Sequence, residues 1–143
     1  MGFPQPRFAI PLMPSLTLPI YYISFHVPAF HLLLFALFRA PGLWLGVAGV
    51  RTLGLKTSET HRPEGVVKTG VYSKVRHPQY LGGLLSHVGI SFLLSAWYSL
   101  LSTPLLVAVI LAISKKEEAE LIKEFGDEYK RYMKEVPMFI PRF

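Results

Sequence analysis

YLGGLLSHVGISFLLSAWYSLLSTPLLVAVILAIS, residues 80–114, runs for 35 positions without a single Asp, Glu, Lys or Arg. One helix of that length would overshoot a bilayer, whose apolar core is crossed by about 20 residues. We therefore predict a helical hairpin over 80–114 that reverses between about 95 and 104, where Ser, Trp, Tyr and Pro cluster. Trp97 and Tyr98 are expected at the membrane–water interface, where such rings gather.

A second uncharged run, 8–38, precedes the hairpin. The whole chain is 51% hydrophobic and only 17% charged, whereas soluble domains carry about 25% charged residues. We predict helices over 15–38 and 42–55, separated by a turn at 39–42. The expected fold is all-α: one integral membrane domain, 1–143, with about four transmembrane helices and a cytoplasmic C-terminal amphipathic helix.

The distribution of basic residues predicts the orientation in the membrane. Lys74 and Arg76 flank one end of the hairpin, and Lys115 and Lys116 flank the other. The positive-inside rule places both ends in the cytoplasm. With four spans, both termini then lie in the cytoplasm and Arg39 lies outside.

Several classes of function are disfavoured by composition. The formal net charge of +6 sits beside apolar runs and forms no basic stripe, so we expect no nucleic-acid partner. The chain has no cysteine, which excludes disulfides, thiolate metal ligands and a cysteine nucleophile, and we expect no metal. The proline-rich N-terminus lacks the layout of a cleaved signal peptide.

The polar loop 56–79 and the tail 115–143 carry the candidate chemistry. The loop holds five basic and two acidic residues, and its end brings together an arginine, an imidazole and two phenols. The tail predicts an amphipathic helix over 115–136. Glu117 shares its apolar stripe, and Glu118 lies about 100° round the helix, so Glu117 is expected to meet a cation, either Arg76 or a ligand. The alternative is a set of solvated charges and interfacial aromatics.

Two segments carry a resemblance to a known family: GVVKTGVYSKVRHPQYLGG at 65–83 and KKEEAELIKEFGDEYKRYMKEVPMFIP at 115–141. They resemble, in order and spacing, the integral membrane methyltransferases that include isoprenylcysteine carboxyl methyltransferases and phospholipid N-methyltransferases. The family pattern is LVxxGxYxxxRHPxYxG, a helical hairpin, and then EExxLxxxFGxxYxxY. The chain has no GxGxxG motif after a strand, which disfavours a soluble nucleotide-binding fold.

The resemblance implies S-adenosylmethionine as the methyl donor and S-adenosylhomocysteine as its product. It places 65–67 along the adenosine and Glu117 at the amino group of the donor, and it suggests that Arg76 braces the pocket against Glu118. No catalytic residue is assigned. The implied cofactor-binding residues are Gly65, Val66, Val67, Tyr72, His77, Pro78, Gln79, Tyr80 and Glu117.

The acceptor implied by the resemblance is lipophilic and comes from the bilayer, with the carboxylate of a prenylated cysteine as the first expectation. One departure concerns Ile113, which stands where the isoprenylcysteine branch has an arginine that orients this carboxylate. A phospholipid amine, another small lipophilic amine or thiol, and a non-catalytic membrane subunit stay open as alternatives; the oligomeric state is not predicted. The expected lining of the acceptor path comprises Leu81, Leu84, Leu85, Val88, Leu106, Val109 and Ile110.

Overall fold

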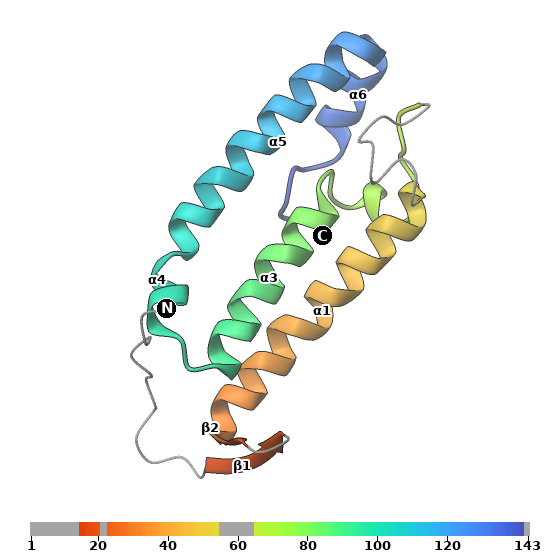
Figure 1. The fold of residues 1–143 in the computed structure, drawn as a ribbon. Coiled ribbons are helices and arrows are strands. Elements are labelled where there is room, and N and C mark those ends of the chain that lie inside the picture. Colours follow the sequence, from red (N-terminus) through yellow and green to blue (C-terminus); the bar gives the residue numbers. More distant parts are fainter. Residues whose placement is uncertain (1–14, 21–22, 55–64, 142–143) are drawn as a thin grey trace.

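The structure is a computed structural model that describes residues 15–20, 23–54 and 65–141. It is predominantly helical, as predicted. Three long helices, α1, α3 and α5, lie side by side with α3 in the middle (Figure 1). The elements are β1 (Ser15–Ile20), β2 (Ile23–Pro28), α1 (Ala29–Leu53), the 3-10 turn η1 (Gly70–Ser73), α3 (Pro78–Leu93), α4 (Trp97–Leu101), α5 (Thr103–Phe125) and α6 (Asp127–Glu135).

The prediction of a helix over 15–38 is wrong in its first part, because 15–20 and 23–28 form a pair of strands. β1 and β2 pair antiparallel, with Ser15 opposite Pro28 and Ile20 opposite Ile23. Pro19 has no backbone N–H for a helix, and the β-branched and aromatic residues around it suit strands. The pair lies at the end of the bundle where α1 begins (Figure 1).

The predicted turn at 39–42 is also wrong, because α1 runs through it with Pro41 inside the helix. Apolar helices tolerate such a proline when neighbouring helices support the backbone. That support comes from α3: a Cβ built on Gly42 would lie 2.8 Å from the carbonyl oxygen of Gly82. Two glycines therefore let the helices pack closely, and one helix of about 37 Å replaces the predicted two.

The predicted hairpin is present. α3 ends at Leu93, the short helix α4 follows, and α5 begins at Thr103. Ser95 adopts a φ of 50° in the reversal. Trp97 and Tyr98 are exposed at this end, as expected of interfacial aromatics.

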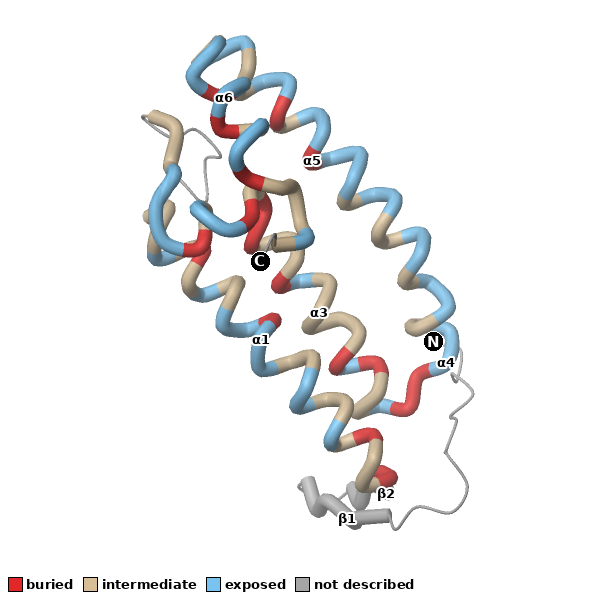
Figure 2. Tube along the Cα trace, turned by 180° about the vertical axis from the view of Figure 1, so that it is seen from behind, coloured by how far each residue is buried: buried red, intermediate tan, exposed pale blue. Residues whose placement is uncertain are grey.

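The predicted tail helix 115–136 is instead divided at Gly126. α5 continues without a break from the apolar segment to Phe125, and Gly126 has a φ of 56°, a conformation that glycine adopts without steric cost. α6 then folds back beside α5 (Figure 1). Its buried residues Tyr129 and Tyr132 form a small core with Val136, which follows the helix, while the outward faces of α1 and α5 are largely exposed (Figure 2).

Candidate active site

A cavity of about 450 Å³ lies at the end of the bundle where α1 ends and α3 begins. The segment 65–77, the first turn of α3, the last turns of α5 and the fold-back of α6 enclose it. Its lining comprises Leu53, Gly65, Val66, Val67, Tyr72, Arg76, His77, Gln79, Tyr80, Glu117, Glu120, Leu121, Glu124, Phe125, Tyr129 and Tyr132.

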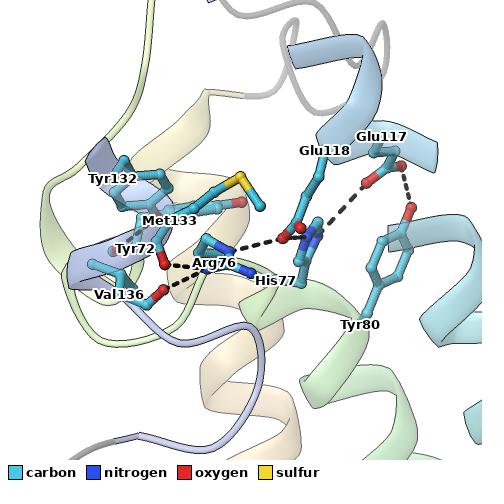
Figure 3. Close-up of polar contacts among 9 residues, drawn as sticks. All are labelled: Tyr72, Arg76, His77, Tyr80, Glu117, Glu118, Tyr132, Met133 and Val136. Atoms are coloured by element: carbon cyan, nitrogen blue, oxygen red, sulfur yellow. Dashed lines mark hydrogen bonds and ion pairs between the residues drawn. The ribbon is translucent and has the colours of Figure 1, made fainter. Parts of the chain in front are cut away.

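Arg76 fixes one wall of this cavity. Its Nε donates to Glu118 Oε1 at 2.7 Å, so the predicted ion pair is present. Its Nη1 donates to the carbonyl oxygens of Met133 at 2.8 Å and Val136 at 2.7 Å. One guanidinium therefore joins the loop before α3 to both α5 and the end of α6 (Figure 3).

His77 lies between the two glutamates of α5. Its Nε2 is 3.0 Å from Glu118 Oε1, and its Nδ1 is 3.7 Å from Glu117 Oε2. The imidazole stacks on the Tyr80 ring, with ring centroids 5.7 Å apart. It also contacts the Phe139 ring, whose centroid lies 5.8 Å from that of His77. Both ring nitrogens thus face carboxylates, which holds the imidazole in place.

Glu117 and Glu118 have different environments. The Tyr80 hydroxyl donates to Glu117 Oε1 (Figure 3), and the Glu117 side chain is 27% exposed and lines the cavity. Glu118, about 100° round the helix from Glu117, is only 4% exposed. Its burial was not predicted: α6 folds back over the Glu118 face of α5, where Arg76 meets it.

The charge state of Glu118 follows from its partners. Burial favours the protonated carboxyl, but the hydrogen bonds from His77 and Arg76 outweigh it and hold the pKa of Glu118 below its ordinary value. Ionised carboxylates accept strong charge-assisted hydrogen bonds of this kind. Glu118 is therefore ionised, and the positive charge of Arg76 balances it.

Phenol groups also line the cavity. Gln79 Nε2 donates to the Tyr72 hydroxyl at 3.2 Å, and the Tyr132 hydroxyl donates to the Tyr72 carbonyl at 2.6 Å. Burial raises the pKa of Tyr72, Tyr129 and Tyr132. These phenols are therefore neutral near pH 7 and present aromatic faces to the cavity.

The described residues of the lining carry more negative than positive charge. Glu117, Glu120 and Glu124 contribute three carboxylates, and Arg76, the arginine among these described residues, is already paired with Glu118. Aromatic faces and carboxylates attract cations. The cavity therefore suits a positively charged ligand better than a phosphate.

All of the predicted cofactor-binding residues except Pro78 line this cavity. Pro78 is buried and begins α3, where a proline costs no hydrogen bond. Sequence analysis did not select Glu120 and Glu124, although they follow Glu117 by three and seven residues, which places them on the same helix face. Part of the predicted loop, 56–64, lies outside the described residues.

The sequence profile of the phospholipid methyltransferase family matches residues 30–128. The chain therefore belongs to this family. The match covers α1, the motif before α3, the hairpin and the two glutamates of α5.

The chain is also similar to parts of several individual proteins. The chain is 34% identical over 95 residues to a protein-S-isoprenylcysteine O-methyltransferase of Schizosaccharomyces pombe, covering 66% of this chain and 40% of the relative. It is 32% identical over 90 residues to a delta(14)-sterol reductase of Mus musculus, covering 59% and 21%. It is 39% identical over 74 residues to methanethiol S-methyltransferase 2 of Bradyrhizobium diazoefficiens, covering 50% and 27%. The chain thus spans less than half the length of each of these proteins.

Proposed function

We propose that this chain is an integral membrane methyltransferase that uses S-adenosylmethionine to methylate a lipophilic acceptor. The observation that carries the proposal is the cavity itself, which the two motif segments enclose with carboxylates and phenol rings. Membership of the phospholipid methyltransferase family supports it, as do the names of the O- and S-methyltransferase relatives.

The residues present fit the donor. S-adenosylmethionine carries an ammonium and a sulfonium and supplies an electrophilic methyl group. Glu117, which faces the cavity, would hold the ammonium, and the rings of Tyr72 and Tyr80 would lie near the cationic part. The backbone and valines of 65–67 would lie along the adenosine. Pro78 contributes by starting α3 rather than by contact with the donor.

The charge of the cavity favours a methyl donor over the cofactor of a reductase. Biological hydride transfer commonly uses a nicotinamide dinucleotide, whose phosphates bind best at helix N-termini or beside free basic groups. Here three carboxylates line the cavity and Arg76 is paired with Glu118. A sulfonium cofactor complements this lining, and a pyrophosphate opposes it.

Three membrane crossings, α1, α3 and the first half of α5, replace the four predicted from sequence. Of the described helices, α1 alone has both the length and the mean hydropathy of a full span. Exposed apolar side chains on α3 and α5, such as Ile90, Leu105 and Val109, support the two shorter crossings. Positive-inside residues near the cavity support a site that faces the cytoplasm, with the N-terminal end of α1 on the opposite side.

A carboxylate acceptor fits the site better than an amine does. An amine has to lose a proton before it attacks the methyl group, and this step calls for a general base. His77 faces two glutamates, and the Tyr80 hydroxyl donates to Glu117, so both candidate bases are already engaged. An ionised carboxylate needs only to be positioned against the donor. The prenylcysteine carboxylate is therefore our first choice, with phospholipid amines and small thiols as alternatives.

Transfer of a labelled methyl group tests the proposal. Vesicles that contain the protein are incubated with methyl-labelled S-adenosylmethionine and, in separate reactions, a prenylcysteine, an amine phospholipid and an alkyl thiol. We expect label in a base-labile methyl ester of the prenylcysteine, and a large loss of label with Glu117→Gln. Folded protein that labels none of the three acceptors would support the non-catalytic alternative.

A further inference from the structure

We propose that the groove between α1 and α3 holds the apolar chain of the acceptor and that Arg51 binds its carboxylate. The inference rests on the proposed methyltransferase function and deepens it by naming the acceptor class: an apolar chain that ends in a carboxylate. It also assigns a binding site that lies outside the donor cavity.

The groove has a volume of about 850 Å³ and follows the contact between the two helices. Glycines form much of its surface, and leucine and valine side chains flank them, a lining that suits a hydrocarbon chain. The residues around it are Arg39, Gly42, Leu43, Gly46, Val47, Val50, Arg51, Gly54, Gln79, Gly82, Gly83 and Ser86.

Gln79 joins this groove to the donor cavity, because it lines both. Its Nε2 donates to the Tyr72 hydroxyl on the donor side. Its aliphatic part covers Gly49 of α1, where a Cβ would lie 2.8 Å from Gln79 Cγ. An acceptor in the groove and a donor in the cavity would therefore meet at this side chain.

The charges of the groove select an anionic ligand. Among the described residues that line it, Arg39 and Arg51 are the charged ones, and none is a carboxylate. Arg39 Nη1 donates to Ser86 Oγ at 2.8 Å and bridges the two helices. Arg51 belongs to the last turn of α1, about 18 Å further along the helix and at the end nearer Gln79. A guanidinium there can hold a carboxylate by two parallel hydrogen bonds.

A second copy of the chain would not supply that anion within the membrane. The sequence has no Asp or Glu in 1–58 or in 65–116. An arginine inside a bilayer is costly unless a partner meets it. A ligand carboxylate would supply the complementary charge, and an acceptor that ends in a carboxylate carries one.

The path for the acceptor chain that was predicted from sequence, between α3 and α5, suits a lipid carboxylate less well than the groove does. Its expected lining, such as Leu84 and Ile110, contributes to neither cavity. Ile113 gives α5 no cation there. The chain after α6 also returns to lie between α3 and α5 (Figures 1 and 2), where Pro137 and Met138 accept backbone hydrogen bonds from the loop before α3.

Two glycines allow the groove to be filled without disturbing the helix contact. A Cβ at Gly46 or Gly83 would meet no atom within 4 Å, so Gly83→Leu and Gly46→Leu extend into open space. Ala112→Leu, on the exposed face of α5, is the matched control. We measure binding of S-adenosylhomocysteine and of a prenylcysteine acid to each purified protein. We expect donor-site affinity within about twofold of the parent in all three, and a loss of about tenfold or more in prenylcysteine affinity in the two groove variants only.

Arg51→Gln tests the carboxylate contact separately. We expect the parent to bind the prenylcysteine acid about tenfold or more tightly than its methyl ester, and Arg51→Gln to bind both alike, since a charged hydrogen bond is lost. Arg51→Lys should retain part of the preference.

Three results would overturn the inference while the parent binds S-adenosylhomocysteine. The first is that the parent does not bind the prenylcysteine acid. The second is that Arg51→Gln prefers the acid over the methyl ester as strongly as the parent does. The third is that both groove variants keep the acceptor affinity of the parent while Ile110→Trp on α5 loses it. A folded parent that does not bind S-adenosylhomocysteine contradicts the proposed function itself, which keeps the two failures distinct.

Discussion

Arg76 Nε lies 2.7 Å from Glu118 Oε1, and their side chains are only 8% and 5% exposed. The two residues come from the loop before α3 and from α5, 42 positions apart. Because Arg76 also binds two carbonyl oxygens of the segment that ends α6, this ion pair ties the loop before α3 to α5 and to the end of α6. It serves as a brace, and Glu117 one residue earlier is left to face the ligand.

Glu118→Gln should destabilise the protein strongly. Removing one partner of a buried ion pair leaves an uncompensated charge, at a cost of about 3–5 kcal/mol. Thermal unfolding in detergent should show a marked fall in Tm. Glu124→Gln, on the exposed face of the same helix, should be nearly silent, and equal Tm values for the two variants would contradict the brace.

The stability of the protein should fall in acid because of the same carboxyl. The pKa of Glu118 is lower in the folded protein than its ordinary value of 4.5, so the unfolded chain binds the proton more readily. Its stabilising contribution is therefore complete above about pH 4.5 and is lost as pH falls through the lowered folded value. Tm measured from pH 7 to pH 3 should decline more steeply below pH 4.5 in the parent than in Glu118→Gln. Parallel curves would contradict this assignment.

Glu117→Gln should weaken donor binding without a large change in stability. A hydrogen bond to a charged group contributes about 1.5–3 kcal/mol, which corresponds to a loss of roughly tenfold or more in affinity. S-adenosylmethionine and S-adenosylhomocysteine share the ammonium but differ in the sulfonium. Equal losses for both ligands place Glu117 at the ammonium, whereas a loss confined to S-adenosylmethionine places it at the sulfonium. Near-native affinity for both would remove it from the site.

The number of crossings can be tested with introduced cysteines, since the chain has none of its own. Ser73, beside the cavity, and Ser102, at the start of α5, are both exposed. With a hairpin of α3 and α5 across the membrane, Ser73→Cys and Ser102→Cys should react with an impermeant reagent from opposite sides of sealed vesicles. Labelling of both from the same side would contradict the proposed crossings.

Much of the candidate site could be predicted from sequence because its residues lie in short, local sequence motifs. The motif with Tyr72, His77 and Tyr80 and the stripe with Glu117 identify groups that do line one cavity. The burial of Glu118 could not be predicted, since it depends on the reversal at Gly126, which lies eight residues further along the chain. Helix periodicity treats 115–136 as one helix and gives no sign of that fold-back.

The N-terminal elements were harder to predict because hydropathy does not separate a strand from a helix in a short apolar run. Pro19 falls within the predicted helix 15–38, but it belongs to β1. Pro41 was interpreted as part of a turn, but it lies inside α1. The contact of Gly42 with α3, which supports α1 at that point, joins residues 40 positions apart and leaves no trace in the local pattern.

Binding of S-adenosylhomocysteine to the purified, folded protein tests the central claim most directly. Calorimetry in detergent should show saturable binding of one ligand per chain, weakened about tenfold or more by Glu117→Gln. A nicotinamide dinucleotide, whose phosphates oppose the carboxylates of the cavity, should not compete. A protein that retains its helical circular dichroism and its Tm yet binds no S-adenosylhomocysteine, or binds the dinucleotide instead, would contradict the account.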